Sequence, residues 1–150
     1  MTEMLFYHLK GQTPEQVLPA LLQKSLERGW RVVVQASSDE RVEALDAHLW
    51  TWRDDAFLPH GTSRDAEAAQ HPIVLTAGDE NPNAATVRFL VDGAVMTADT
   101  TRYERIVLLF NGDDPDALDA ARARWTEAKA AGAEATYWQA DEQGRWKRQG

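Results

Sequence analysis

The sequence contains no cysteine and no long apolar run. The lack of cysteine excludes disulfides, zinc–thiolate sites and a thiol nucleophile. No apolar segment approaches the roughly 20 residues that span a bilayer, and the first residues, MTEMLFYHLKG, lack the pattern of a secretory signal. We therefore expect a cytoplasmic protein with no membrane contact. The length of 150 residues predicts one globular domain over 1–150.

Positive charge is scarce, because 16 basic residues stand against 24 acidic ones and the net charge is −8. Such a field repels phosphate backbones, so we expect no direct nucleic-acid binding. The distribution is uneven: the segment from residue 120 onward has six basic and four acidic residues, which is +2, and the rest carries −10. A locally basic end on an acidic body suits a small anionic partner.

Phosphate-binding glycine motifs are also missing. The first strand-to-helix turn, HLKGQTP, has a single glycine, and neither G-x-G-x-x-G nor G-x-x-x-x-G-K-[ST] occurs anywhere. There is no G-x-S-x-G elbow, and the four histidines have no metal-ligand spacing. A buried or turn-stabilising role is expected for His60. Together these absences favour a protein with no catalytic residue, cofactor or metal.

Strands alternate with helices along the chain, which predicts a three-layer α/β fold with a mostly parallel sheet. The pure apolar centre of RIVLLFNG suggests a central strand. Helices are predicted from Thr13, which begins a capping box with Gln16, from Ser37, whose partner would be Glu40, and from Asp114 to Gly132. The predicted strands are EMLFYHL, WRVVVQ, PIVLTA, TVRFLVDG, RIVLLFNG and EATYWQ, with GRWK as a terminal extension.

An acidic cluster, Asp113, Asp114 and Asp116, follows RIVLLFNG. Carboxylates at the carboxyl end of a parallel strand can hold Mg²⁺, so one reading is a phosphoryl-transfer enzyme or nuclease, with Asp79 as a further ligand. The other reading is that these acids cap the next helix, which their position beside Pro115 explains fully.

Aromatic side chains gather in LWTWRDDAFLPHG, where the second helix ends. Helical spacing puts Leu49 and Trp52 on the core-facing stripe and rotates Trp50 to the flank, where it is only partly covered. Phe57 and Leu58 cannot pair as a strand through Pro59. The segment is either a satellite core under a loop or a patch that buries a partner protein.

The last helix presents two stripes. Small residues with one arginine are predicted to face the sheet, whereas the other stripe is too cationic to be core. Trp125 between cations suits a short acidic peptide that ends in a hydrophobic residue and a free carboxylate. Alternatively, the Arg and Lys stems simply cover Trp125. The sheet-facing stripe is Ala117, Ala121, Arg124, Ala128 and Ala131, and the cationic one is Leu118, Arg122, Trp125 and Lys129.

Taken in order, LWTWRDDAFLPHG, HPIVLT, NPN, RIVLLFNG, ARARW and TYWQ resemble the chi subunit of bacterial DNA polymerase III holoenzyme over nearly the whole chain. Asn111 and Ala140 depart from the usual LFDG and YWQQ forms. The resemblance implies a Rossmann-like fold without a nucleotide-binding motif, and a non-catalytic accessory subunit of the clamp-loader complex.

The resemblance also implies partners. The psi subunit, with a helicase as a further candidate, would bind Leu49, Trp50, Phe57 and Pro59. The acidic C-terminal tail of the single-stranded-DNA-binding protein would place its terminal carboxylate on Arg122, its last ring against Trp125 and its acidic residues near Lys129. Three further residues are expected in the tail site. Tyr137 and Trp138 are included because they are near it, and Leu118 because it shares the cationic stripe of the last helix.

Overall fold

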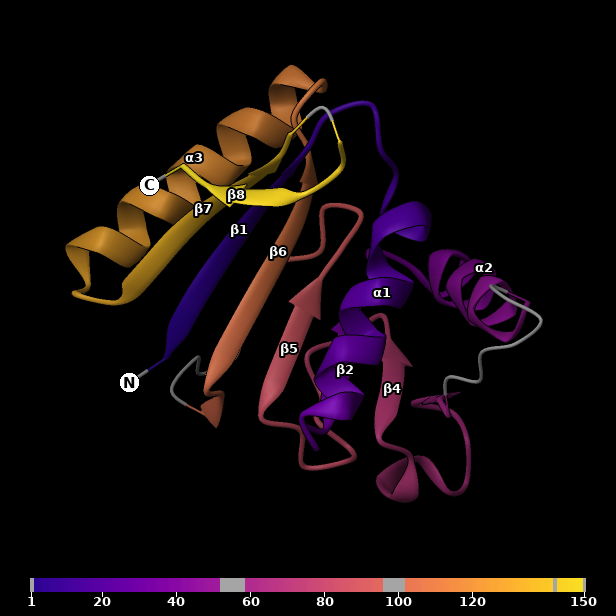
Figure 1. The fold of residues 1–150 in the computed structure, drawn as a ribbon. Helices are drawn as coiled ribbons and strands as arrows, with labels where there is room; N and C mark the ends of the chain where they lie inside the picture. Colours follow the sequence, from indigo (N-terminus) through magenta and orange to yellow (C-terminus); the bar gives the residue numbers. More distant parts are fainter. Residues whose placement is uncertain (1, 52–58, 96–101, 142, 150) are drawn as a thin grey trace.

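The structure is a computed structural model that describes residues 2–51, 59–95, 102–141 and 143–149 (Figure 1). Three α-helices and a short 3-10 helix are present in these segments, namely α1 Pro14–Glu27, α2 Asp39–Trp50, α3 Pro115–Ala130 and η1 Ala68–Gln70. The strands are β1 Glu3–Leu9, β2 Val32–Gln35, β3 Gly61–Thr62, β4 Ile73–Thr76, β5 Val87–Leu90, β6 Arg105–Asn111, β7 Glu134–Ala140 and β8 Trp146–Arg148.

The strands form one sheet in the order β3-β4-β2-β5-β6-β1-β7-β8. All described neighbours pair in parallel except β7 and β8, which are antiparallel. Strand β6, whose centre is purely apolar, lies between β5 and β1, so its predicted central position is confirmed. A strand buried on both faces needs such a continuous apolar run, because neither face meets water.

Two hydrophobic clusters lie on opposite faces of the sheet and define three layers. The larger cluster packs α1 and α2 through Leu18, Leu22, Leu45 and other apolar residues. The smaller one packs α3 through Ala121 and Ala128. Figure 1 shows α1 and α2 together and α3 away from them, at the β1–β7 end of the sheet. The predicted three-layer α/β fold with a mostly parallel sheet is confirmed.

Local capping rules set the helix starts, with one correction. Thr13 begins α1 with the predicted capping box: its side chain accepts from the Gln16 amide, and Gln16 accepts from the Thr13 amide. The prediction of Ser37 as the second cap is wrong. Ser38 accepts from the Arg41 amide instead, which leaves two acidic residues in the first turn, next to the positive end of the helix dipole.

The polar segment HGTSRDAEAAQH, in which the sequence indicates neither a helix nor a strand, contains β3 and η1. The terminal GRWK is strand β8 in part, since it pairs with β7. Trp52, predicted on the core-facing stripe of α2, lies outside the described residues. None of the helices among the described residues is long and apolar enough to cross a membrane.

Arg88 is fully buried in strand β5, where all the other residues are apolar. Its guanidinium donates to Gln35 Oε1 at 2.7 Å and to the Tyr103 hydroxyl at 3.1 Å. It also donates to the carbonyls of Gly78 and Glu80. A buried cation is tolerated only when its donors are satisfied, so this network holds the 78–80 turn against the sheet.

Candidate functional site

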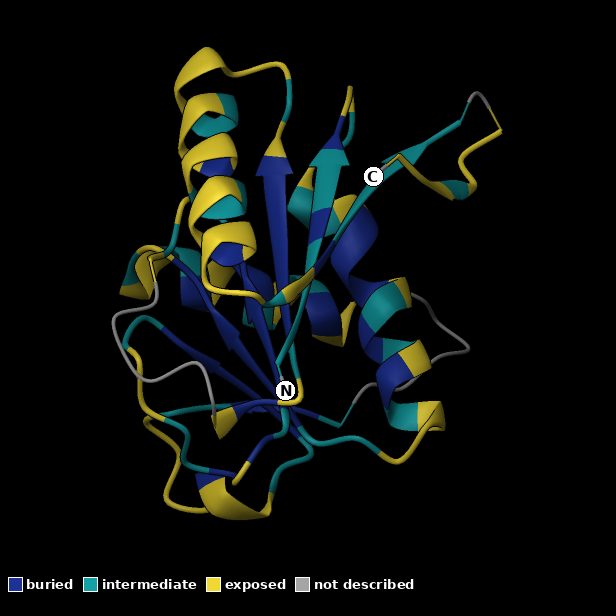
Figure 2. Cartoon of the chain, turned by 90° about the vertical axis from the view of Figure 1, so that its left-hand side faces the viewer, coloured by how far each residue is buried: buried dark blue, intermediate teal, exposed yellow. Residues whose placement is uncertain are grey.

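The first candidate site is the α3 surface, which we define as Leu118, Arg122, Trp125, Lys129 and Tyr137. Asp114 caps α3 by accepting from the Asp116 amide, and Pro115 takes the first helical position. Ala121 and Ala128 are buried toward the sheet, whereas Arg122 and Lys129 are exposed. In Figure 2 the outward side of α3 is exposed along its length, and its buried positions face the sheet.

The cationic stripe of α3 was predicted to lie outside the core. This prediction is wrong in part, because two of its four residues pack against the core. Leu118 and Trp125 pack against the smaller hydrophobic cluster. The Trp125 ring meets Phe6 edge-on, with centroids 5.3 Å apart and an interplanar angle of 77°. It meets Tyr137 at 5.9 Å and 85°. Edge-to-face pairs of this kind fix the orientation of the Trp125 ring, so the ring offers a rigid apolar surface.

The outer boundary of this ring is cationic. Lys129 Nζ lies 4.9 Å from the Trp125 ring centroid, within cation–π range. Arg122 is near enough to act electrostatically on both His8 and Tyr137. Neighbouring Arg124 is turned elsewhere, because it pairs with Glu127 at 2.7 Å. An apolar wall therefore stands between two cations, an arrangement that can receive an anionic group attached to a ring.

His8 also lies at this site, although the sequence did not predict it there. Its Nδ1 lies 2.5 Å from the Tyr137 hydroxyl. Burial lowers the pKa of His8, with Lys10 and Arg122 acting in the same direction and Asp113 opposing them. Burial raises the pKa of Tyr137, against the effect of Arg122. Both groups are therefore neutral at neutral pH, and the His8 tautomer decides which of them donates in this hydrogen bond.

Gly112 makes room for the His8 ring. A Cβ atom at position 112 would collide with the His8 ring at Nε2. The glycine after RIVLLFN thus leaves the space that the ring of a histidine more than 100 residues away in the chain occupies, and a larger residue would require that ring to move. The only signal in the sequence was a glycine after a central strand, which does not name its neighbour.

Trp138 is not part of the α3 surface. Side chains alternate along a strand, and Tyr137 faces α3 whereas Trp138 faces the opposite side of the sheet. There it contacts Tyr7, with centroids 6.2 Å apart. The expectation that Trp138 joins Arg122 and Trp125 in one pocket therefore fails on strand geometry.

The acidic cluster at the end of β6 bonds to backbone amides. Asp114 Oδ1 accepts from the Asp116 amide at 3.0 Å, and Asp113 Oδ2 accepts from the Gly11 amide at 2.8 Å. Within the described ranges no group of three histidine, aspartate or glutamate side chains could hold a metal ion. Asp114 thus caps α3 as predicted, whereas Asp113 joins the end of β6 to the loop between β1 and α1.

The second candidate site is the α2 surface, which we define as Trp50 and Pro59 with His60 beneath them. Trp50 is 50% exposed, as predicted for the helix flank. Its ring lies on the buried His60, with centroids 4.2 Å apart and a tilt of 36°. His60 Nε2 in turn lies 3.1 Å from Asp46 Oδ1, which confirms the expected buried, structural histidine.

Two other residues predicted for this surface have different outcomes. Leu49 is buried in the larger core cluster, so it presents no surface of its own. Phe57 lies outside the described residues. Pro59 is half-buried. The α2 and α3 surfaces lie at opposite ends of the sheet (Figure 1).

Comparison with known proteins gives a consistent result. Residues 1–136 match the family model described as "DNA polymerase III chi subunit, HolC". The chain is 28% identical over 91 residues to the probable DNA polymerase III subunit chi of Rickettsia prowazekii (strain Madrid E), which covers 61% of this chain and 55% of that protein.

A second relative is the DNA polymerase III subunit chi of Pseudomonas aeruginosa, 30% identical over 86 residues, or 55% of this chain and 59% of that protein. Both alignments thus span little more than half of each curated relative. The family model, by contrast, covers most of the chain, including all of β1 to β6, α3 and the start of β7. The chain belongs to the DNA polymerase III chi subunit family.

Proposed function

We propose that this chain is a non-catalytic accessory subunit of the clamp-loader complex of DNA polymerase III. In this role it links the psi subunit to the acidic C-terminal tail of the single-stranded-DNA-binding protein during DNA replication. The observation that carries the proposal is the α3 surface, where a ring held by the core stands between Arg122 and Lys129 on an otherwise acidic protein. Function of this kind requires shape and charge, and no bond is made or broken.

The tail would bind the α3 surface in an orientation that its charges dictate. Arg122 would take the terminal carboxylate, and the last aromatic ring of the tail would lie against Trp125 and Tyr137. Lys129 would meet acidic residues further back in the tail. One ring and a few exposed ion pairs give an affinity of roughly micromolar, which falls as salt rises.

The psi subunit would cover the α2 surface. A half-exposed tryptophan on a rigid, buried support is the kind of residue that dominates protein–protein interfaces. Pro59 and Phe57 would complete the proposed contact, whereas Leu49 is buried in the core and would contribute no exposed surface. A helicase is a competing occupant of the same surface.

Calorimetry tests the tail site directly. A synthetic tail peptide is titrated into the wild type and into Arg122→Ala, with Arg124→Ala as the matched control, because Arg124 lies on the same helix but pairs with Glu127. Arg122→Ala should weaken binding by about 1 to 3 kcal/mol without unfolding the protein. A peptide lacking its final aromatic residue should bind more weakly to every variant. Wild-type affinity in Arg122→Ala would refute the role of Arg122.

Pull-down with psi tests the other surface. Trp50→Ala and Phe57→Ala should each strongly reduce psi capture, while the tail peptide still binds at wild-type affinity. Loss of both activities in one variant would indicate a collapsed fold. As a check on the enzyme alternative, adding Mg²⁺ should leave the melting temperature unchanged, whereas a metal site at Asp113, Asp114 and Asp116 would raise it.

A further inference from the structure

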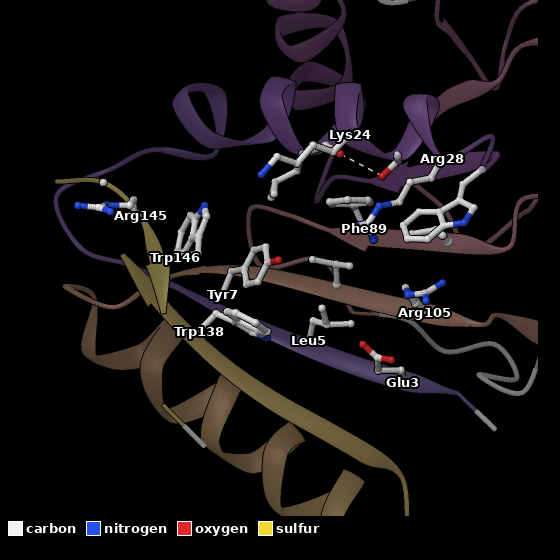
Figure 3. A pocket seen from close by; sticks show the side chains of 16 residues that line it. Glu3, Leu5, Tyr7, Lys24, Arg28, Phe89, Arg105, Trp138, Arg145 and Trp146 are labelled. Atoms are coloured by element: carbon white, nitrogen blue, oxygen red, sulfur yellow. Dashed lines mark hydrogen bonds between the residues drawn. The ribbon is translucent and has the colours of Figure 1, made fainter. Parts of the chain in front are cut away.

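A groove with a volume of about 710 Å³ lies on the face of the sheet opposite the α3 surface. One side of the groove is α1, and the other is the β7–β8 hairpin (Figure 3). Strands β1, β5 and β6 form its floor. Neither surface discussed so far includes it.

The floor of this α1 groove is apolar and aromatic. Leu5, Phe89 and Val107 lie along it, and Tyr7 continues it toward the hairpin. Tyr7 stacks on Trp146, with centroids 4.8 Å apart and an angle of 11°. Burial raises the pKa of Tyr7, so its hydroxyl stays neutral and the floor carries no charge. The floor can therefore accept a bulky apolar side chain.

The rim, in contrast, is basic. Four of its five charged side chains are cations, which reverses the charge balance of the whole protein. Arg105 lies 4.2 Å and Arg28 5.0 Å from the Trp30 ring centroid, so both guanidinium groups are held in place. Arg145 is 3.9 Å from Asp141, and its side chain is 77% exposed. The charged rim consists of Lys24, Arg28, Arg105, Arg145 and the single carboxylate of Glu3.

We propose that the α1 groove binds an extended acidic peptide segment that carries a bulky apolar side chain. The apolar side chain would lie on the floor, and the flanking carboxylates would meet the cations of the rim. No free terminal carboxylate is required, which distinguishes this ligand from the tail proposed for the α3 surface. The two sites lie on opposite faces of the sheet, so both can be occupied together.

Single-stranded nucleic acid fits the groove less well. Bases bind such surfaces by stacking on open aromatic faces. Here two arginines already lie over Trp30, and Tyr7 and Trp146 stack on each other. The net charge of −8 also repels a long polyanion, which extends beyond the groove. A short acidic segment, in contrast, meets mainly the local positive charge of the rim.

The test uses a hexapeptide, Asp-Asp-Leu-Phe-Asp-Asp, acetylated at its N-terminus and amidated at its C-terminus. It is titrated into the ¹⁵N-labelled full chain, and the indole N–H signals are followed by NMR. The signals of Trp30, Trp138 and Trp146 should shift, and those of Trp50 and Trp125 should not. A peptide with Ser-Ser in place of Leu-Phe should show much weaker binding, since the apolar anchor is gone.

Charge reversal supplies the second arm. The double variant Lys24→Glu with Arg145→Glu changes two exposed rim residues, and affinity should fall about tenfold. The control is Arg64→Glu, an exposed arginine at the β3 edge, which should bind as the wild type does. Melting curves verify that each variant is folded.

Four results would overturn the proposal. They are an unchanged affinity in the double variant, shifts confined to Trp125, equal binding of the Ser-Ser peptide, and tighter binding of an oligothymidylate with the same indole shifts. The last result would assign the groove to nucleic acid. Since the probe has no free carboxylate, failure here leaves the proposed tail site untouched, and failure of the Arg122 experiment leaves the groove untouched.

Discussion

Trp125 and Trp50 stand at opposite ends of the sheet and are held in opposite ways. Trp125 packs edge-on against Phe6 and Tyr137, and cations lie only at its outer boundary. Trp50 is half-exposed at the last residue of α2 and lies on His60. The Trp125 ring packs against the core, whereas the Trp50 ring lies half-exposed at the surface.

The difference in support predicts a difference in partner. A ring fixed by the core is already oriented, so a short peptide can bind it without paying to order the receptor. An exposed ring gains most when a large partner covers it and excludes water around it. We therefore associate the α3 surface with a small ligand and the α2 surface with a folded protein.

The largest expected effect separates the two rings by stability. Trp125→Ala removes an indole from between Phe6 and Tyr137 and should lower the free energy of unfolding by about 2 to 3 kcal/mol. Trp50→Ala should cost less than about 1 kcal/mol, because half of that side chain already meets water. Urea denaturation measures both. Equal losses of unfolding free energy in the two variants would contradict the proposed difference between the two tryptophans.

A smaller effect tests whether the α3 surface depends on packing behind it. Gly112→Ala places a methyl group where the His8 ring lies, so His8 must shift and its contact with Tyr137 must break. We expect a loss of about 1 to 3 kcal/mol in unfolding free energy and weaker binding of the tail peptide. Binding of psi should be unchanged. If the variant is as stable as the wild type, His8 is not confined as described.

The smallest effect is the pH dependence of stability at His8. Its pKa in the folded protein is below the ordinary value of 6.5, because burial disfavours the charged ring. Below about pH 6.5 the unfolded chain therefore takes up a proton that the folded protein does not, and acid lowers stability. Melting temperatures at pH 7.5 and 5.5 should differ less in His8→Gln than in the wild type. An identical decrease in the two proteins would contradict the shift.

Much of the fold follows from local patterns. The capping box at Thr13, the cap at Asp114 and the apolar runs of the strands locate nearly every element within a few residues. The cap of α2 was misplaced by one residue because either of two adjacent serines can cap a helix, and the backbone geometry selects Ser38 although only Ser37 has a glutamate three residues later. Arg88 was overlooked because its donors meet acceptors on separate turns and strands.

The candidate site was less predictable than the fold. Helical spacing placed Arg122, Trp125 and Lys129 together, since residues three and four apart share a helix face. Strand alternation was available to separate Tyr137 from Trp138, but it does not say which side faces α3. His8 joins the site only because β1 and β7 are neighbours in the sheet.

Local sequence patterns were enough to place the three α-helices and most of the strands, and to show which residues of α3 share a face, because these features depend on neighbours within about four positions. Three features could be found in the tertiary structure alone: His8 lies against Tyr137, the His8 ring fills the space beside Gly112, and a basic groove opens beside α1. Each of these contacts joins residues from distant segments, and the order of the strands in the sheet brings them together.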